Sequence, residues 1–425
     1  MVEQLSLFNC LPLGNNQKQF KISKPIRLIE LFAGIGAQAK ALENLGIDFE
    51  HYKIVEFDKY AVASYNEVHG TKFETSDITK VRSSELEIRE RERFTYIMTY
   101  SFPCQDLSLA GKNKGMAKGS GTRSGLLWEV ERLLDELDGE LPQVLLMENV
   151  PQVIGKKNMA DFYMWKSKLE ALGYKNYIQI LNAKDYGIPQ NRKRCFMVSI
   201  LGNYTYQFPT TCELKIKLKD LLEDNVDEKY YLSDKMMKYL QTKSSGGIDR
   251  KEIFERNLKN TMVKGLSPTL TTREGSRATD TYIVVKSATK QGYAIAKEGD
   301  DIDLGCARAN HRGSVQSGLS QTLKTQCDVG VCVVGNYMPS GHEASRILDP
   351  KGLAPTIKEN HGTINAVKED LRVRKLTPKE CWRLMGFSDI DYEKASKVVS
   401  NSQLYKQAGN SIVVNVLEAI FKQMM

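Results

Sequence analysis

The feature that most constrains the fold is a regular alternation of short apolar runs with longer stretches of helical periodicity. The apolar runs lie at residues 26–32, 53–57, 96–100, 144–147, 177–181 and 194–200. Between them, residues 37–45, 126–137 and 160–172 repeat apolar positions at helical spacing. Because strands that alternate with helices pair side by side and bury both faces of their sheet, this order predicts an α/β fold. The sheet should be doubly wound and mostly parallel.

The character of the chain changes after about residue 205. Helical periodicity becomes rare there, and Gly, Ser, Thr and Lys separate short β-like runs such as 281–285 and 330–334. A similar six-residue turn begins at Gly265, Gly318 and Gly352, and we interpret it as a repeated structural unit. Apolar residues near the C-terminus predict an amphipathic helix that starts at Asn410 and Ser411 and docks on the first domain. We therefore expect an N-terminal arm (1–24), a cofactor-binding catalytic domain (25–205), a smaller loop- and β-rich domain (206–395) and a returning C-terminal segment (396–425).

Composition excludes several classes of protein. No apolar run approaches the ~20 residues that span a bilayer, and the first residues lack the basic start and apolar core of a secretory signal. The 8 cysteines are scattered without Cys-x-x-Cys pairs, so we expect free thiols in a reducing cytoplasm and no metal site. The 60 Lys and Arg outnumber the 52 Asp and Glu, and the net charge of +8 is compatible with a polyanionic partner without requiring one.

The first apolar run leads into a glycine-containing turn. Gly34 and Gly36 precede a helix, and with Ala39 they fit the loose Gly-x-Gly-x-x-Ala pattern of nucleotide-binding turns. Glu56 ends the next strand, and Asp77 follows a third expected strand. Acids at these strand ends suit ribose hydroxyls, so the pattern predicts an adenosine-containing cofactor. A nicotinamide nucleotide and S-adenosylmethionine fit this part of the sequence equally well.

Groups suited to covalent catalysis lie at the ends of three other strands. Cys104 comes in a Pro-Cys turn after the run 96–100, Glu148 follows the run 144–147, and Arg192 and Arg194 precede the last strand. Each has a structural alternative, as a buried thiol, a surface acid or a solvated edge. Together, however, they suit methylation of cytosine: a thiolate adds to carbon 6, a protonated carboxyl serves N3, and the guanidinium groups stabilise the carbonyl oxygen and orient the acid.

A cytosine inside a duplex cannot present its face to a thiol, so the target base must be flipped out. The Gly- and Lys-rich stretch 110–125 follows Cys104 and resembles a mobile loop. We expect Lys112, Lys114 and Arg123 in this stretch to contact DNA phosphates. A surface loop without such a role fits its composition as well.

These motifs resemble the DNA cytosine-5 methyltransferase family of bacterial and phage type. The matching segments are Phe32 to Gly36, Glu56, Asp77-Ile78, Pro103-Cys104-Gln105, Glu148-Asn149-Val150, Gln190 to Arg194, Arg374 to Phe387 and Gly409 to Ile412. The resemblance implies an S-adenosylmethionine site lined by Phe32, Gly34, Gly36, Glu56, Asp77, Ile78, Asn410 and Ser411. It also implies that Cys104 is the nucleophile. Two departures are Met385, where Gln is usual, and Ser76, where Gly is usual.

The same resemblance makes the region between Arg194 and Arg374 the target-recognition domain. Candidate DNA contacts are Gln105, Arg273, Arg277, Arg308 and Arg312. The expected substrate is double-stranded DNA, methylated by a monomer in a bacterial cell or a phage-infected host, with a separately encoded restriction endonuclease as a possible partner.

Three alternatives remain open at this point. A relative that methylates cytosine in transfer RNA would share the Pro-Cys and Glu-Asn-Val motifs, although the long variable region favours DNA. A NAD-dependent oxidoreductase explains the glycine pattern but assigns no role to Cys104, Glu148 and the arginine pair. A catalytically silent DNA-binding module would not need the intact Cys and Glu.

Overall fold

The structure is a computed structural model. It describes residues 18–104, 106–107, 115–231, 283–286, 293–296, 300–303, 315–317, 319–321, 329–333 and 372–425. The chain divides into two compact units. The first contains Met1–Ile216, Thr322–Gln326 and Pro378–Met425, and the second contains Lys217–Gln321 and Cys327–Thr377. The return to the first unit at Pro378 comes earlier than the boundary at 395 expected from the sequence.

The first unit is built around a sheet of six strands. They are β1 (Ile26–Leu31), β2 (Phe49–Val55), β3 (Thr95–Tyr100), β4 (Val144–Asn149), β5 (Tyr174–Asn182) and β7 (Lys193–Leu201). Their order in the sheet is β2-β1-β3-β4-β7-β5. The first four pair in parallel, whereas β7 runs antiparallel to both β4 and β5. The mostly parallel α/β sheet predicted from the sequence is confirmed.

The strand order creates a switch point beside β1. The chain passes from β1 to β2 on one side and later returns to β3 on the other side of β1. Ligands of open α/β sheets bind outside the carboxyl ends of the strands at such a point. The loops that follow β1, β2, β3 and β4 therefore define the region in which a site is expected.

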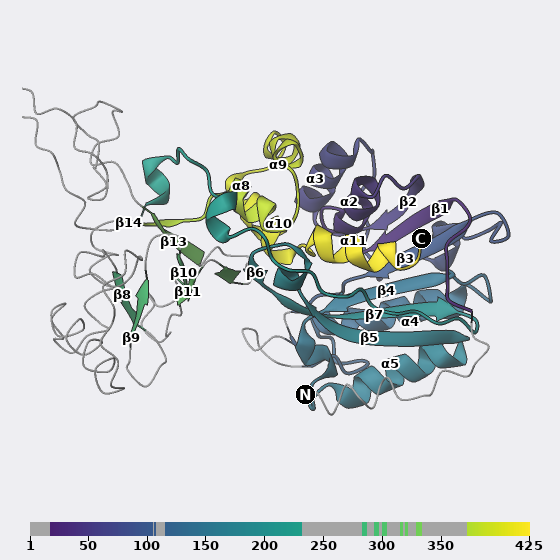
Figure 1. The fold of residues 1–425 in the computed structure, drawn as a ribbon. Helices are drawn as coiled ribbons and strands as arrows, with labels where there is room; N and C mark the ends of the chain where they lie inside the picture. The colour runs from purple at the N-terminus through teal and green to yellow at the C-terminus, as the bar shows by residue number, and fades with distance from the viewer. Residues whose placement is uncertain are drawn as a thin grey trace, which may run out of the picture. The chain divides into compact units, whose positions relative to one another are not determined.

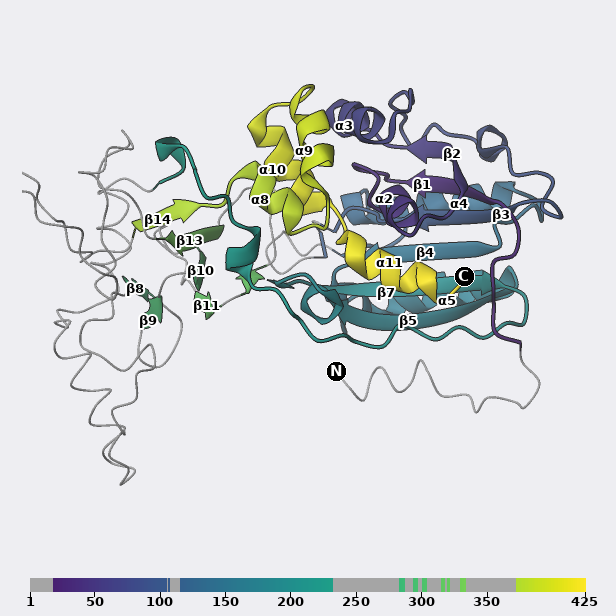
Figure 2. The same cartoon turned by 45° about the horizontal axis from the view of Figure 1, so that its top comes forward.

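Helices cover both faces of this sheet. α2 (Ala37–Asn44) and α11 (Val414–Lys422) lie side by side over one face, while α4 (Leu127–Glu136) and α5 (Met159–Ala171) cover the other (Figures 1 and 2). Side chains from neighbouring strands contact helices on opposite faces of the sheet. Glu30 of β1 accepts a bond from the Ala39 N–H of α2, whereas Tyr100 of β3 accepts one from the Trp165 indole of α5. The helices expected at 37–45, 126–137 and 160–172 are confirmed, with no end shifted by more than one residue.

Two local predictions are wrong. Residues 71–77 form no strand, because this segment is attached to the end of β2 by a bond from the Ser76 N–H to the Glu56 carbonyl. The last helix begins at Val414 and not at Asn410, which ends α10 (Asn401–Asn410). Ser411 follows in an extended conformation (φ −66°, ψ 163°) and terminates α10.

More helix follows residue 205 than the sequence predicted. Besides α10, the first unit contains α8 (Pro378–Arg383) and α9 (Asp389–Ser396). These helices are short, and the apolar residues on α8 are few: Cys381 and Trp382 are the buried ones besides Pro378. Their periodicity is therefore weak in the sequence. The fold buries them through contacts with one another, such as the bond from the Trp382 indole N–H to the Leu404 carbonyl.

The described part of the second unit consists mainly of strands. A four-stranded antiparallel sheet has the order β11-β10-β13-β14, and β8 pairs with β9. The strands are β8 (Ile283–Lys286), β9 (Tyr293–Ala296), β10 (Asp300–Asp303), β11 (Val315–Ser317), β13 (Val329–Val333) and β14 (Arg372–Lys375). The repeated turns that begin at Gly265 and Gly352 lie outside the described residues, as does Gly318. In the described part of the chain, no helix is long and apolar enough to cross a membrane.

A candidate active site at the carboxyl edge of the sheet

A cavity of about 610 Å³ opens in the first unit where β1, β2, β3 and β4 end. Most of the described residues that the sequence singled out line it. They are Phe32, Gly34, Glu56, Asp77, Ile78, Cys104, Arg123, Glu148, Arg192, Arg194, Asn410 and Ser411. Gln105, Lys112, Lys114, Arg273, Arg277, Arg308 and Arg312 lie outside the described residues.

The turn after β1 forms one wall of the cavity. The Phe32 N–H donates to the Val55 carbonyl at 2.7 Å, and both Phe32 (φ 59°) and Gly34 (φ 58°) have left-handed backbone conformations. A non-glycine residue in this conformation is uncommon and indicates a local constraint. The Gly34 N–H donates to Oε2 of Glu56 at 2.9 Å, so the glycine turn and the acid after β2 hold each other in place.

Glu56 is oriented by two backbone donors. Its Oε1 accepts the Asp58 N–H at 2.8 Å, while Oε2 accepts the Gly34 N–H. Burial raises the pKa of Glu56, and these backbone bonds oppose the rise. Each carboxylate oxygen keeps acceptor capacity, because one oxygen can accept two bonds. The carboxyl group is therefore positioned to receive hydroxyl donors from a ligand in the cavity.

Gly36 has a different environment from the one expected. It caps the start of α2 with φ 76° and does not line the cavity. A Cβ atom at this position would lie 2.3 Å from Nε2 of His69 and 2.6 Å from the Tyr65 ring. Gly36 therefore allows α2 to pack closely against α3 (Lys59–His69). Its assignment to the cofactor site remains a prediction, and the structure adds this packing role.

The second acid is held by its own turn. Asp77 Oδ1 accepts bonds from the Thr79 N–H at 3.0 Å and the Thr79 hydroxyl at 2.8 Å. These bonds lower the pKa of Asp77. The preceding residue, Ser76, also lines the cavity, and its buried hydroxyl has no hydrogen-bond partner among the residues that the structure describes. A buried polar atom without a partner is costly, so a bound ligand that met it would offset that cost.

The Cys104 turn is fixed from two sides. Asn149 Nδ2 donates to the Phe102 carbonyl at 2.9 Å, and the Ser124 hydroxyl donates to the Pro103 carbonyl at 2.6 Å. These bonds tie the turn after β3 to the end of β4 and to the short helix η2 (Arg123–Leu126). The thiol of Cys104 is free and partly exposed at the cavity. Burial raises its pKa, and the Glu148 carboxylate adds to the rise.

Glu148 and Arg194 form an ion pair beside this thiol. Arg194 Nε lies 3.0 Å from Glu148 Oε1, and both side chains are largely buried. The pairing follows from the sheet, because Glu148 of β4 stands opposite Phe196 of β7, and Arg194 lies two residues along on the same face. Burial raises the pKa of Glu148, and Arg194 and Arg192 oppose the rise.

Arg192 has structural partners at the C-terminal turn. Its guanidinium group is 3% exposed and donates to the carbonyl oxygens of Gly409 (3.0 Å) and Ser411 (2.7 Å). The Gly409 carbonyl belongs to the last turn of α10, which also carries Asn410, and the Ser411 carbonyl begins the connection to α11. Arg192 thus joins the strand edge that holds Arg194 to the turn that lines the other side of the cavity.

Comparison with known proteins decides the family. Residues 26–425 match the profile of the C-5 cytosine-specific DNA methylases. The chain belongs to this family. It is a DNA cytosine-5 methyltransferase of the type II or orphan kind, and members of its family use S-adenosylmethionine as the methyl donor. This match favours DNA methylation over the transfer-RNA enzyme, the oxidoreductase and the silent binding module considered above.

Curated relatives align with the methyltransferase over nearly its full length. It is 37% identical to the orphan methyltransferase M.SssI of Spiroplasma monobiae, and the alignment covers 94% of this chain and 97% of the relative. It is 31% identical to the type II methyltransferase M2.ScrFI of Lactococcus lactis subsp. cremoris, with 94% and 99% covered. It is 30% identical to the orphan methyltransferase M.SPRI of Bacillus phage SPR, with 94% and 97% covered.

Solved structures agree with the fold of the methyltransferase. The methyltransferase EhMeth of Entamoeba histolytica superimposes with a TM-score of 0.58 at 15% identity and covers 95% of this chain and 98% of its own. The Dnmt2 methyltransferase of S. pombe gives a TM-score of 0.55 at 17% identity, with 94% and 97% covered. At such low identities the likeness concerns the fold alone.

The sequence did not single out several cavity residues of the methyltransferase. Phe57 lines the cavity while its side chain is 78% exposed, which is unusual for a large apolar residue. The signal in the sequence that could have indicated Phe57 was its position directly after Glu56, the acid at the end of the strand. Lys406 also lines the cavity and donates to Asp58 Oδ2 at 2.6 Å, a contact across 348 residues that local pattern cannot predict.

Of the two departures from the family pattern, Met385 has a packing role. It is fully buried, its carbonyl accepts the Val414 N–H at 2.9 Å, and its sulfur lies 3.8 Å from the Gln190 amide nitrogen. The neighbouring Gly386 (φ 82°) faces Asn415 and Val414 so closely that a Cβ would lie 2.4 Å from Asn415 Oδ1. The segment thus fixes the start of α11.

Proposed function

We propose that this methyltransferase transfers a methyl group from S-adenosylmethionine to carbon 5 of a flipped-out cytosine in a specific duplex sequence. In this proposal Cys104 forms a transient covalent adduct with the base. The observation that carries it is that one cavity contains the Cys104 thiol, the Glu148–Arg194 pair and the glycine turn with Glu56. Nucleophile, proton donor and cofactor-binding groups are then within reach of the same bound molecules.

The residues present fit S-adenosylmethionine. The cavity volume of about 610 Å³ lies within the range of roughly 300–1,000 Å³ typical of small-molecule sites. Glu56 and Asp77 offer acceptors to the ribose and adenine, and the exposed Phe57 ring offers a stacking surface. The Ser76 hydroxyl has no hydrogen-bond partner in the described part of the chain. Phe32, Ile78, Asn410 and Ser411 would complete the site. When bound, S-adenosylmethionine supplies an electrophilic methyl group.

Cys104 would act on the other reactant. Its sulfur adds to carbon 6 of cytosine, which interrupts the aromatic ring and makes carbon 5 nucleophilic. Loss of the hydrogen from methylated carbon 5 and cleavage of the sulfur–carbon bond then restore the ring and release the enzyme. Because burial raises the pKa of Cys104, the thiol is mainly protonated before the base binds. Attack must therefore be coupled to stabilisation of the ring.

Glu148 would provide that stabilisation. As sulfur adds to carbon 6, negative charge develops at N3, and a neutral carboxyl group can donate a proton there. Burial raises the pKa of Glu148 and so favours its protonated form. Arg194 already donates to Oε1 at 3.0 Å, which leaves Oε2 as the oxygen that carries the proton toward the base. Arg194 is thus proposed to orient the acid.

The remaining site residues predicted from the sequence have supporting roles in this proposal. Arg192 anchors the turn between α10 and α11 and so shapes the cavity in which the carbonyl oxygen of cytosine would lie. Arg123 lines the cavity, and we propose that it contacts DNA together with Gln105, Lys112 and Lys114. Arg273, Arg277, Arg308 and Arg312 remain predicted DNA contacts of the second domain.

We propose double-stranded DNA as the substrate of a monomer that acts in the cytoplasm of a bacterial cell or a phage-infected host. A separately encoded endonuclease would be consistent with the type II relatives. Bisulfite sequencing of DNA from a host that expresses the chain would report both activity and the recognised site.

A trapping experiment tests the covalent step. The enzyme is incubated with S-adenosylmethionine and a duplex that contains the target site with 5-fluorocytosine. Fluorine at carbon 5 cannot leave as a proton, so the adduct should accumulate, and peptide mass spectrometry should find the modified base on Cys104. Cys104→Ala should give no adduct. An adduct on another residue, or a wild-type enzyme that methylates normal DNA but never traps, would refute the assignment of Cys104.

A further inference from the structure

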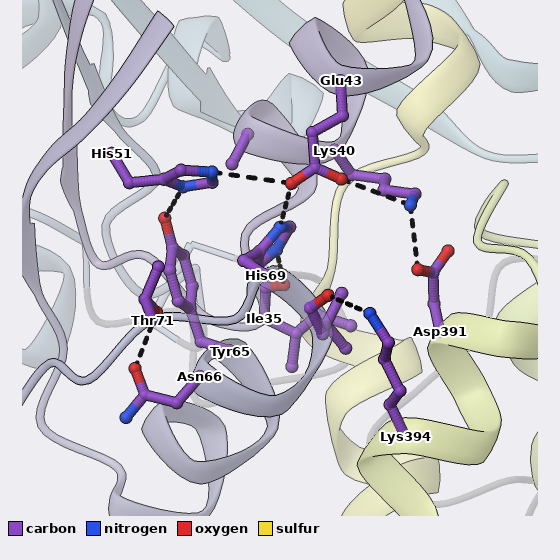
Figure 3. Close-up of polar contacts among 12 residues, drawn as sticks. Ile35, Lys40, Glu43, His51, Tyr65, Asn66, His69, Thr71, Asp391 and Lys394 are labelled. Carbon is purple, nitrogen blue, oxygen red and sulfur yellow. Dashed lines mark hydrogen bonds and ion pairs between the residues drawn. The ribbon is translucent and has the colours of Figure 1, made fainter.

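Two histidines and a glutamate converge outside the cavity of the first unit. Glu43 lies on α2, His51 on β2 and His69 at the end of α3, and we call these three residues the His-Glu cluster (Figure 3). His69 Nδ1 lies 2.6 Å and His51 Nε2 lies 3.6 Å from the same atom, Oε1 of Glu43. The His69 side chain is fully buried, and those of His51 and Glu43 are 20% and 28% exposed.

The outer ring nitrogens of both histidines have fixed roles. His69 Nε2 lies 3.1 Å from the Ile35 carbonyl oxygen, which can only accept, so this nitrogen carries a hydrogen. His51 Nδ1 lies 3.1 Å from the Tyr65 oxygen, and the Tyr65 hydroxyl donates its own hydrogen to Glu30 at 2.6 Å. His51 Nδ1 is therefore also a donor. The 2.6 Å contact between His69 Nδ1 and Glu43 Oε1 is a hydrogen bond, whose hydrogen a bound metal ion would replace. In the neutral tautomer of His51, the lone pair of Nε2 faces the same carboxylate oxygen.

The carboxylate is oriented in the same way. Glu43 Oε2 pairs with Lys40 Nζ at 3.3 Å, and Lys40 is itself held by Asp391 Oδ1 at 2.8 Å. The lysine occupies the outer oxygen, so Oε1 faces the two imidazoles (Figure 3). Each of the three inner atoms thus has an outer partner that orients its side chain. Histidines that bind a metal commonly donate their second N–H to a carbonyl or another acceptor in this manner.

We propose that the His-Glu cluster binds a zinc ion through Glu43 Oε1, His51 Nε2 and His69 Nδ1. Two imidazoles and one carboxylate form a recognised three-ligand zinc set with a fourth position for water. The three ligand atoms lie within 4.8 Å of one another. Tetrahedral zinc with bonds of about 2.0–2.1 Å holds its ligand atoms about 3.3 Å apart. The 3.6 Å separation fits, and the 2.6 Å separation needs to open by less than about 1 Å.

The choice of metal follows from the donors. Imidazole nitrogen suits zinc and its transition-metal neighbours, whereas Mg²⁺ and Ca²⁺ prefer oxygen ligands. The sequence predicted no metal site because these ligands come from three separate elements and lack the close spacing of a zinc motif. Only the folded first unit brings them together.

A bound ion would support the turn that lines the cofactor cavity. His69 donates to the carbonyl of Ile35, and Ile35 is itself a cavity residue. Gly36, the next residue, leaves the space that the His69 ring occupies. Zinc would fix that ring, and with it the path of the backbone between Gly34 and α2. The site is therefore structural, because Glu43, His51 and His69 are not among the residues that line the cavity.

The test measures metal binding by the full-length protein after treatment with a chelator. Zinc alone is titrated by calorimetry, and Co²⁺ is bound in its place to identify the ligands from its absorption spectrum. We expect one equivalent bound through nitrogen and oxygen, without the thiolate charge-transfer band that cysteine ligands would give. His51→Gln and Glu43→Gln should each weaken binding more than about 100-fold, beyond the 10–100-fold typical of losing an outer partner. Glu50→Gln is the matched control, because Glu50 adjoins His51 on β2 but pairs with Arg27.

Folding of each variant is checked by circular dichroism and by S-adenosylmethionine binding without metal. Loss of binding in both ligand variants, with wild-type affinity in Glu50→Gln, supports the site. The proposal is overturned if the wild-type protein binds no zinc, if cobalt reports thiolate ligands, or if either ligand variant keeps wild-type affinity. It is equally overturned if Glu50→Gln loses binding to the same extent.

Discussion

The two glycines of the turn after β1 should respond very differently to the same substitution. Both Gly34 and Gly36 have left-handed backbones, with φ values of 58° and 76°. Alanine in that conformation costs about 1–2 kcal/mol at either position. At Gly34 a Cβ would meet no atom within 4 Å, whereas at Gly36 it would lie 2.3 Å from His69 and 2.6 Å from Tyr65.

The neighbours of Gly36 cannot move aside easily. His69 is held by Glu43 and the Ile35 carbonyl, and Tyr65 is fully buried and bonded to Glu30. Overpacking of this kind costs typically about 1–3 kcal/mol in addition to the backbone term. We therefore expect Gly34→Ala to lose about 1–2 kcal/mol of unfolding free energy and Gly36→Ala about 2–5 kcal/mol.

Urea denaturation followed by circular dichroism measures the two stabilities, and calorimetry measures S-adenosylmethionine affinity under native conditions. Gly34 lines the cavity, so Gly34→Ala should weaken cofactor binding while the protein remains comparatively stable. Gly36→Ala should instead lose mainly stability and change cofactor affinity less than Gly34→Ala does. Equal losses of stability in the two variants, or a larger loss at Gly34, would refute the assignment of Gly36 to helix packing.

The remaining predictions concern catalysis and DNA binding. Cys104→Ala should abolish methyl transfer and retain cofactor affinity; full turnover by this variant would contradict its role as nucleophile. Glu148→Gln should slow single-turnover methylation by roughly 10²–10⁴-fold, the usual loss for a missing proton donor, and an unchanged rate would remove Glu148 from the mechanism. The protonated form of Glu148 is the active one and burial raises its pKa, so the rate should fall as pH rises through that value. Arg194→Met removes a charge that lowers this pKa and should move the alkaline limb to higher pH; a limb that stays in place would show that Arg194 does not set the proton affinity of Glu148. Lys112→Ala should reduce the slope of log affinity against log salt by about 1, whereas an identical slope would exclude a phosphate contact.

Much of the fold follows from local pattern. The strands that become β1, β3 and β4 were predictable because parallel strands buried on both faces are continuous apolar runs. α4 was predictable because its leucines recur at helical spacing. The strand expected before Asp77 was wrong, because the segment 71–77 is bonded to Asn66 of α3 and to the Glu56 carbonyl and does not pair in a ladder. The helices α8 to α10 were not expected, since short helices with few apolar residues have a weak period.

The candidate site was predictable to the extent that strand ends converge. A parallel sheet brings its carboxyl ends to one edge, so the sequence alone indicated that Cys104, Glu148 and Glu56 would share a site. It could not determine what each neighbouring group would contact. Arg192 was expected beside the reacting base, but its bonds to the Gly409 and Ser411 carbonyls connect parts of the chain more than 200 residues apart.

The sequence by itself determined the family, the α/β sheet and the groups able to do the chemistry, because these depend on residue type and on spacing along the chain. Only the tertiary structure decided that Gly36 makes room for His69, that Asn149 fixes the Cys104 turn, and that Glu43, His51 and His69 meet. The reason is physical: contacts between distant segments depend on how helices pack on a sheet, and periodicity indicates which face of a helix is buried but not which residues that face meets.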